Sequence, residues 1–159
     1  MNLKTMTAAL GAAAVAALAP AAADASSVQR DVDRIMERVP GGTQTGPRTI
    51  AWSGGRVTAE VQARAGSFCL FAVCLYASSN QRGTRVRFGC GTHNVTRWFP
   101  PSTLAGVSSW SAHYSGELSN IPKGAPPNTV GQGISIPSSR RGNVPRWFND
   151  QAKSLFVRC

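Results

Sequence analysis

The chain has 159 residues and a formal net charge of +10, from 17 Lys and Arg against 7 Asp and Glu. This length fits one ordinary domain, and no segment reaches the roughly 20 apolar residues that a membrane span needs. The basic residues are spread along the chain without interleaved aromatics, so we expect no nucleic-acid partner, whereas an anionic cell-envelope polymer stays open as a partner.

The first 25 residues have the features of a secretory signal peptide. Lys4 is followed by the Ala-rich apolar stretch Met6 to Ala19 and by small-residue cleavage patterns that end at Ala23 and Ala25. We therefore expect residues 1–25 to be removed and the protein to be secreted and extracellular. Four cysteines in an oxidising compartment predict two disulfides, because the spacing offers no CxxC pair for a metal or redox site.

Residues 26–48 are expected to form an N-terminal helix and a polar linker. Ser26 and Gln29 resemble a capping box, and Pro40 with two glycines after it predicts the end of the helix. One apolar face is formed by Val28, Val32, Ile35, Met36 and Val39.

Residues 49–159 are expected to form an antiparallel β domain that begins with a hairpin, Thr49–Trp52 and Arg56–Ala63. Further strands are predicted at Ser67–Tyr76, Thr84–Phe88, Val107–Tyr114, Gly133–Ile136 and Ser154–Cys159. The triplet Arg97-Trp98-Phe99 recurs at residues 146–148, which suggests a duplicated unit, with chance as the alternative.

One segment resembles a known family. Tyr76 is followed seven residues later by Gly83, and the wider pattern CLYxxxNxxGxxxxF…CG with a later SSW is similar to secreted actinobacterial metalloproteinase inhibitors of β/γ-crystallin fold. The resemblance implies a β/γ-crystallin-like antiparallel Greek-key sandwich with one short N-terminal helix and hairpin. It also implies that Tyr76 and Gly83 mark a folded hairpin whose glycine permits the chain to double back.

The calcium signature of that fold is degraded in this chain. Its first copy would fall at residues 104–109, without an acidic ligand, and its second at Asn149, Asp150 and Ser154, where Lys153 occupies a ligand position. Calcium prefers six to eight oxygen ligands, so we expect no strong metal site and treat these three residues as weak calcium candidates. No other cofactor is expected.

The resemblance implies the disulfide pairs Cys69–Cys74 and Cys90–Cys159. A continuous strand would hold the first two cysteines about 16 Å apart, which a disulfide cannot span. A hairpin centred on Arg82 would instead pair Cys74 with Cys90 and leave Cys69 for Cys159. Both pairings stay open from the residues alone, and in either the four cysteines are structural staples.

An enzyme is not expected. His93 and His113 are the two histidines, neither lies in a recognised catalytic motif, and three of the few acids lie in the predicted helix. The family resemblance implies a secreted inhibitor of extracellular peptidases, zinc metallopeptidases in particular, that acts through a rigid, disulfide-supported loop. The candidate loops are Gly91–Pro101 and Ile121–Pro127.

The alternative is a cationic cell-envelope-binding or antimicrobial module. Two arginine groups would then bind an anionic polymer: Arg82, Arg85 and Arg87, and Arg140, Arg141 and Arg146.

Overall fold

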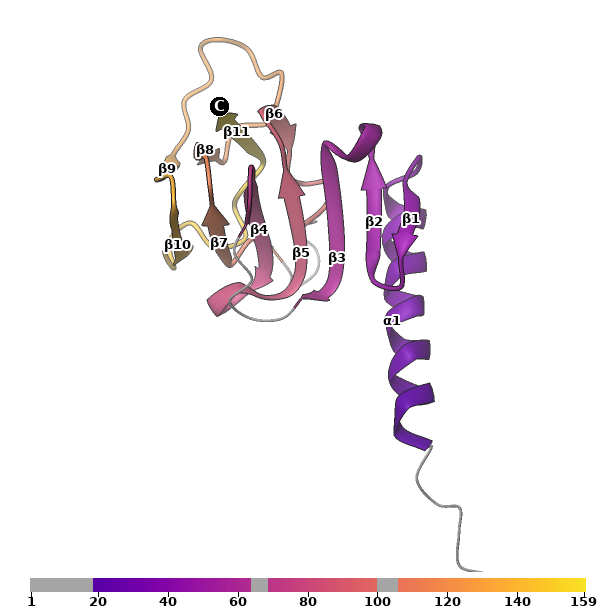
Figure 1. Cartoon of the computed structure of the whole chain (residues 1–159). Helices are drawn as coiled ribbons and strands as arrows, with labels where there is room; N and C mark the ends of the chain where they lie inside the picture. The colour runs from indigo at the N-terminus through magenta and orange to yellow at the C-terminus, as the bar shows by residue number, and fades with distance from the viewer. Residues whose placement is uncertain (1–18, 64–68, 100–105) are drawn as a thin grey trace, which may run out of the picture.

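A computed structural model describes residues 19–63, 69–99 and 106–159, and shows one α-helix beside two antiparallel β-sheets (Figure 1). The helix is α1 (Ala19–Arg38), and the first sheet has the strand order β1-β2-β3-β5-β4-β7-β10. Its strands are β1 (Thr43–Gly46), β2 (Thr49–Trp52), β3 (Val57–Ala63), β4 (Val73–Ser78), β5 (Arg82–Phe88), β7 (Ser109–Ala112) and β10 (Arg140–Asn143). The second sheet has the order β6-β11-β8-β9, from β6 (Gly91–Asn94), β8 (Ser115–Ser119), β9 (Gly133–Ile136) and β11 (Ser154–Arg158).

The strand pairing forms two interlocked Greek keys. In the first key, β7 returns to lie beside β4, while the third strand, β6, crosses to the second sheet and pairs with β11. In the second key, β11 returns beside β8, while β10 crosses to the first sheet and pairs with β7. A fourth strand beside the first defines a Greek key, and here the two keys exchange their third strands.

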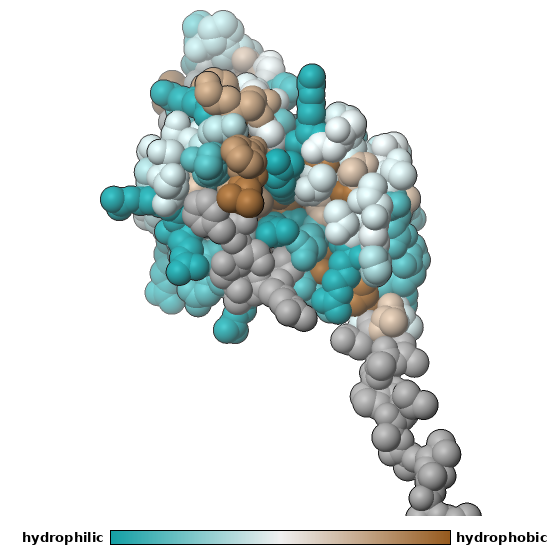
Figure 2. Space-filling model, viewed as in Figure 1, coloured by the Kyte–Doolittle hydropathy of each residue, from teal (hydrophilic) through white to brown (hydrophobic). Residues whose placement is uncertain are grey.

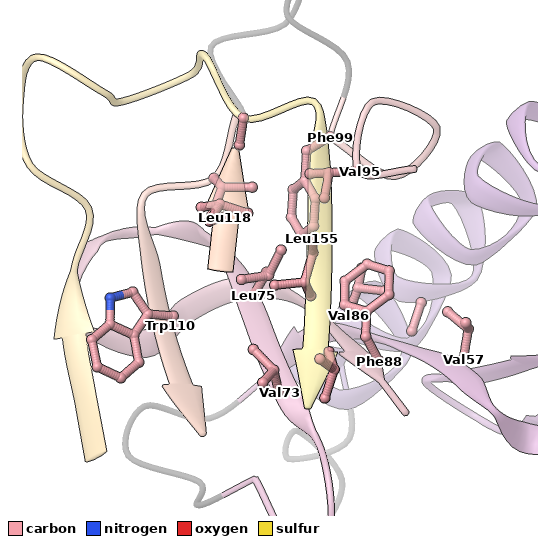
Figure 3. Packing of buried hydrophobic residues seen from close by; sticks show 14 of the residues in the cluster. Val57, Val73, Leu75, Val86, Phe88, Val95, Phe99, Trp110, Leu118 and Leu155 are labelled. Carbon is pink, nitrogen blue, oxygen red and sulfur yellow. The ribbon is translucent and has the colours of Figure 1, made fainter. Parts of the chain in front are cut away.

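The core lies between the sheets, with alternate residues of facing strands pointing inward (Figure 3). Leu75 and Val86 come from the first sheet, and Leu118 and Leu155 come from the second. All four are almost completely buried. Burial of such side chains stabilises the fold by about 1.5–3 kcal/mol each relative to exposure.

The helix uses the apolar face that the sequence predicts, but it begins earlier than expected. Val28, Val32 and Val39 are buried, and α1 packs against β2 and β3. Residues 26–29 lie inside the helix, so the predicted capping-box start at Ser26 is wrong, because the alanine-rich segment before it is itself helical.

The hairpin of β2 and β3 and the strands β5, β9 and β11 agree with the sequence prediction in type and approximate position. The polar linker at residues 43–48 instead contains β1, which pairs with β2. The predicted strand Ser67–Tyr76 is also wrong in its first half, since β4 begins at Val73. Residues 67 and 68 lie outside the described residues.

The Tyr76–Gly83 segment is a folded hairpin between β4 and β5. Asn80, Gln81 and Gly83 all have positive φ, and a Cβ added to Gly83 would lie 2.9 Å from Ser78 Oγ. Ser109 fastens this hairpin, because its Oγ accepts a hydrogen bond from Gln81 N (2.9 Å) and donates one to Ser78 O (2.6 Å). Only glycine fits position 83 without strain.

Two disulfides connect the cysteines. Cys69 is bonded to Cys74, and Cys90 is bonded to Cys159, which is the pairing that the family resemblance implies. The first closes a short loop beside β4, and the second ties the end of β11 to the residue that precedes β6. Among the helices that the structure describes, none is long and apolar enough to cross a membrane.

Candidate functional site

Residues 69–74, here named the Cys69–Cys74 loop, are closed by a disulfide and carry two exposed apolar side chains. Leu70 is 59% exposed and Phe71 is 60% exposed, whereas Cys69, Ala72 and Cys74 are buried. The loop therefore presents two large apolar side chains to solvent from a buried base. A water-exposed Leu-Phe pair gains free energy when a partner covers it, since apolar burial is favourable.

The backbone turns sharply at Phe71. Its φ of +51° lies in the left-handed region, which is uncommon for a bulky residue. The turn brings the Cα atoms of Cys69 and Cys74 to 5.7 Å, close enough for the disulfide. A strained turn of this kind persists because the surrounding contacts determine it, and such turns concentrate at binding sites.

Hydrogen bonds hold the loop on the outer face of the first sheet. Ala72 O accepts hydrogen bonds from His113 N (2.9 Å) and Tyr114 N (3.4 Å). The Arg87 guanidinium donates to Leu70 O at 3.4 Å, while the Phe71 ring lies 4.9 Å from the His113 ring, centroid to centroid. Both sides of the exposed pair are thus fixed to the sheet.

A small second core anchors the base of the loop. Cys69, Ala72, Cys74 and Tyr76 form a buried cluster separate from the main core. The Tyr76 hydroxyl is 3.0 Å from Ser111 Oγ on β7, so the ring is fixed in position. Tyr76, which the sequence predicts as a marker of the folded hairpin, therefore also supports the loop.

Positive charge stands on both sides of the loop. In the strand register, Cys74 is opposite Arg87 on β5 and opposite Ser111 on β7, and Ser111 is opposite Arg141 on β10. Residues opposite each other in register share one face of a sheet. In Figure 2 the surface in view is mostly hydrophilic or neutral, with hydrophobic areas that are small and separate.

The two candidate loops from the sequence differ from this site. In Gly91–Pro101, residues 91–94 form β6, Val95 and Phe99 are buried, and Pro100 and Pro101 lie outside the described residues. The Ile121–Pro127 segment belongs to the long loop between β8 and β9, at the top of Figure 1, and its exposed side chains are mostly polar or proline. In their described residues, neither presents an exposed apolar pair held by a disulfide.

Sequence reasoning missed Leu70 and Phe71 because an apolar run reads as a buried strand. The close spacing of Cys69 and Cys74 was the available signal, since a disulfide between them requires the four intervening residues to leave the strand. Arg87 was identified as part of a basic group, but its contacts with the loop carbonyls depend on strand register.

The two histidines occupy structural positions. His93 Nε2 is 2.8 Å from Gly89 O, and its ring packs against the Phe88 ring. Burial is the main cause that lowers the pKa of His93 below its usual value, and the positive charge of Lys123 acts in the same direction. His113 contributes its ring to the support of Phe71.

Some polar atoms of the weak calcium candidates bond to each other or to the backbone, but Asp150 Oδ1 is buried without a hydrogen-bond partner among the described residues. Asn149 Nδ2 donates to Asp150 Oδ2 (3.0 Å), and Ser154 Oγ donates to Ile121 O (2.7 Å). Asp150 has φ of +63° and lies against Gly106. The described residues contain no group of three or more His, Cys, Asp or Glu side chains that could hold a metal, and residues 104 and 105 lie outside them.

Comparison with known proteins gives a distant likeness of fold. No protein-family model and no curated protein matches the chain. A solved structure described as "Evolution of the eye lens beta-gamma-crystallin domain fold" is similar, with a TM-score of 0.46 and 18% identity, over 64% of this chain and 96% of that one. The fold class rests on the chain's own strand pairing, which is mainly β with two antiparallel sheets.

Proposed function

We propose that this protein is a secreted inhibitor of an extracellular peptidase and that the Cys69–Cys74 loop is the part that enters the peptidase. The observation that carries the proposal is the exposed Leu70-Phe71 pair on a loop closed by a disulfide and hydrogen-bonded at both sides. A peptidase with an apolar specificity pocket would cover one of these side chains.

Rigidity of the loop is the physical basis of inhibition. Burial of the exposed part of Leu70 and Phe71 is worth about 1–2 kcal/mol each, and a loop that is already ordered gives up little of this to conformational entropy. If the peptidase cut the loop, the Cys69–Cys74 disulfide and the hydrogen bonds to Ala72 O would hold both new ends in place. Product release would then be slow, and the cut would be reversible.

Zinc metallopeptidases are proposed as the target class because of the family resemblance of the Tyr76–Gly83 segment. The proposed selectivity comes from the apolar pair and from the charges beside it. Arg87 and Arg141 flank the loop in register and favour a target with an acidic rim.

The test is titration of the purified, oxidised protein against a panel of secreted zinc and serine peptidases. We expect stoichiometric inhibition of a zinc enzyme, and a large loss of affinity in Leu70→Ala or Phe71→Ala, about tenfold or more for the side chain that enters the pocket. The matched control is Val130→Ala, which removes a 96% exposed apolar side chain from the distant loop between β8 and β9.

Three outcomes are informative. Equal losses in Val130→Ala and Phe71→Ala would remove the loop from the proposal. Inhibition of serine enzymes in place of zinc enzymes would overturn the target class. Absence of inhibition across the panel, with the folded protein resistant to cleavage, would favour the cationic module.

For that alternative, Arg82, Arg140, Arg141 and Arg146 are exposed and available to an anionic polymer. Arg85 is less available because it forms a salt bridge with Glu60. Retention on an anionic matrix that is lost at moderate salt would support the alternative.

A further inference from the structure

A cleft of about 470 Å³ lies on the molecule apart from the Cys69–Cys74 loop. The end of α1, the β2–β3 hairpin and β6 with the turn after it form its walls. The residues on which the inference rests are Trp52, Ser53, Asn94, Arg97, Trp98 and Lys123. This volume is within the usual range for small-molecule sites.

Comparison of the two Greek keys shows how the cleft arises. The first copy of the repeat begins at the last residue of β6 and reads Asn94-Val95-Thr96-Arg97-Trp98-Phe99. The second begins at the last residue of β10 and reads Asn143-Val144-Pro145-Arg146-Trp147-Phe148, so the repeat spans six positions with one mismatch. In both copies the valine and the phenylalanine are buried.

The tryptophans of the two copies differ in their surroundings. Trp98 is partly buried and makes an edge-to-face contact with Trp52, with ring centroids 4.5 Å apart. Trp147 is 53% exposed. Trp52 belongs to β2, so the N-terminal hairpin covers one copy of a duplicated turn and converts it into one wall of a cleft.

The charge of the cleft is positive. Arg97 and Lys123 are exposed and line it, and its described lining residues include no Asp or Glu. Within the described part of the chain, neither cation forms a salt bridge. The lowered pKa of His93, which burial causes first and Lys123 second, agrees with a positive field at the cleft wall.

The cleft also carries neutral polar groups. Ser53 and Thr92 contribute hydroxyl groups, while Asn94 Oδ1 accepts hydrogen bonds from Thr96 N and Thr96 Oγ1. Asn94 lines the cleft, and its amide nitrogen has no hydrogen-bond partner among the described residues. The two cations suit an anionic group of a ligand, and the hydroxyl and amide groups suit its hydroxyls. The partly buried Trp98 indole suits a ring.

We propose that this cleft binds a sugar that carries a carboxylate or a phosphate. Arg97 and Lys123 hold the anionic group, Ser53, Thr92 and Asn94 hydrogen-bond the hydroxyls, and Trp98 packs against the ring. This site is separate from the peptidase-binding loop and adds a second binding function to the protein.

The test is calorimetric titration of the oxidised protein with glucuronate, glucose 6-phosphate, glucose and inorganic phosphate, with amide NMR shifts to locate binding. We expect saturable binding of at least one anionic sugar. Comparison of glucuronate with glucose 6-phosphate shows whether a carboxylate or a phosphate is preferred. Glucose and inorganic phosphate should each bind about tenfold more weakly, because each lacks one part of the recognised chemistry.

Variants make the assignment specific. Arg97→Gln and Lys123→Gln should each weaken binding about tenfold, while Arg146→Gln, at the repeat-equivalent position outside the cleft, should leave it unchanged. Peptidase inhibition should be the same in all three, so failure here is distinguishable from failure of the inhibitor proposal. Absence of saturable binding of both anionic sugars, equal affinity for inorganic phosphate, or an equal effect of Arg146→Gln would overturn the proposal.

Discussion

His93 shows how one side chain can make the stability of this fold depend on pH. Its ring lies against Phe88, at 5.1 Å between centroids, and its Nε2 is 2.8 Å from Gly89 O. Burial disfavours the charged imidazolium more than the carbonyl contacts favour it, so the pKa is lowered. The unfolded chain therefore takes up a proton at a higher pH than the folded protein.

The first prediction follows from the sign of this shift. NMR titration should give a pKa for His93 below about 6.5, the unperturbed value. Stability should be full above that pH and should fall as the pH is lowered from about 6.5 toward the folded-state pKa. His93→Gln should reduce that decline in denaturation experiments. A measured pKa at or above the unperturbed value would contradict the prediction.

At the scale of elements, the folded hairpin between β4 and β5 depends on a buried serine of β7. Ser109 Oγ serves both Gln81 N and Ser78 O, and the serine itself is inaccessible to solvent. The equivalent serine of the second key, Ser154, donates to Ile121 O. In both keys a serine at the start of the fourth strand donates its hydroxyl to a backbone carbonyl near the end of the first strand.

The second prediction concerns this serine. Ser109→Ala should lower the free energy of unfolding by about 1–3 kcal/mol, because it leaves the buried Gln81 N–H without its acceptor. Chemical denaturation monitored by tryptophan fluorescence would measure the change. Ser135→Ala, on the exposed side of β9, is the control and should have an effect within about 0.5 kcal/mol. Similar losses in both variants would count against the role of Ser109.

The sequence predicted the elements whose side chains alternate clearly or whose turn requires glycine. Val57, Ala59 and Val61 of β3 are all buried as their spacing predicts, and Gly83 marks the β4–β5 turn. The strands β6, β8 and β10 were missed because they are short and rich in polar or glycine residues, with the sequences GTHN, SGELS and RRGN. Their pairing depends on partners 14 or more residues away in the sequence, so no local pattern predicts them.

The candidate site was less predictable than the fold. Phe71 is a good strand residue by its propensity, and its left-handed backbone follows from the disulfide and from the hydrogen bonds to Ala72 O. The cleft beside Trp98 depends on Trp52 and Lys123, which come from distant parts of the chain. Tertiary contacts of this kind are absent from any local window of sequence.

At the scale of the whole molecule, the two disulfides constrain the chain over very different lengths. The Cys90–Cys159 bond spans a sequence separation of 69 residues and ties β11 to the rest of the second sheet. The Cys69–Cys74 bond spans 5 residues and shapes the exposed loop. In the chain-entropy model, the long closure contributes about 4 kcal/mol and the short one about 2 kcal/mol.

The third prediction separates the effect of each disulfide on stability from its effect on inhibition. Replacement of Cys90 and Cys159 by serine should lower the free energy of unfolding by about 4 kcal/mol, and inhibition should persist at temperatures where the variant stays folded. Replacement of Cys69 and Cys74 by alanine should cost about half as much stability and should abolish inhibition. Denaturation curves and peptidase titrations of the same two variants test both parts. The reverse pattern would show that the loop does not depend on its own disulfide.

The central place of β11 also bears on when the domain can form during synthesis. Both β6 and β8 pair with β11, so the second sheet lacks the strand that joins them until residues 154–158 have been synthesised. The segments that precede residue 154 therefore cannot complete the native sandwich, because the strand that lies between β6 and β8 is still absent. A chain that stopped short of residue 154 would leave the edges of β6 and β8 open, and open edges recruit strands from other molecules. Early termination should therefore yield aggregates rather than a smaller working protein.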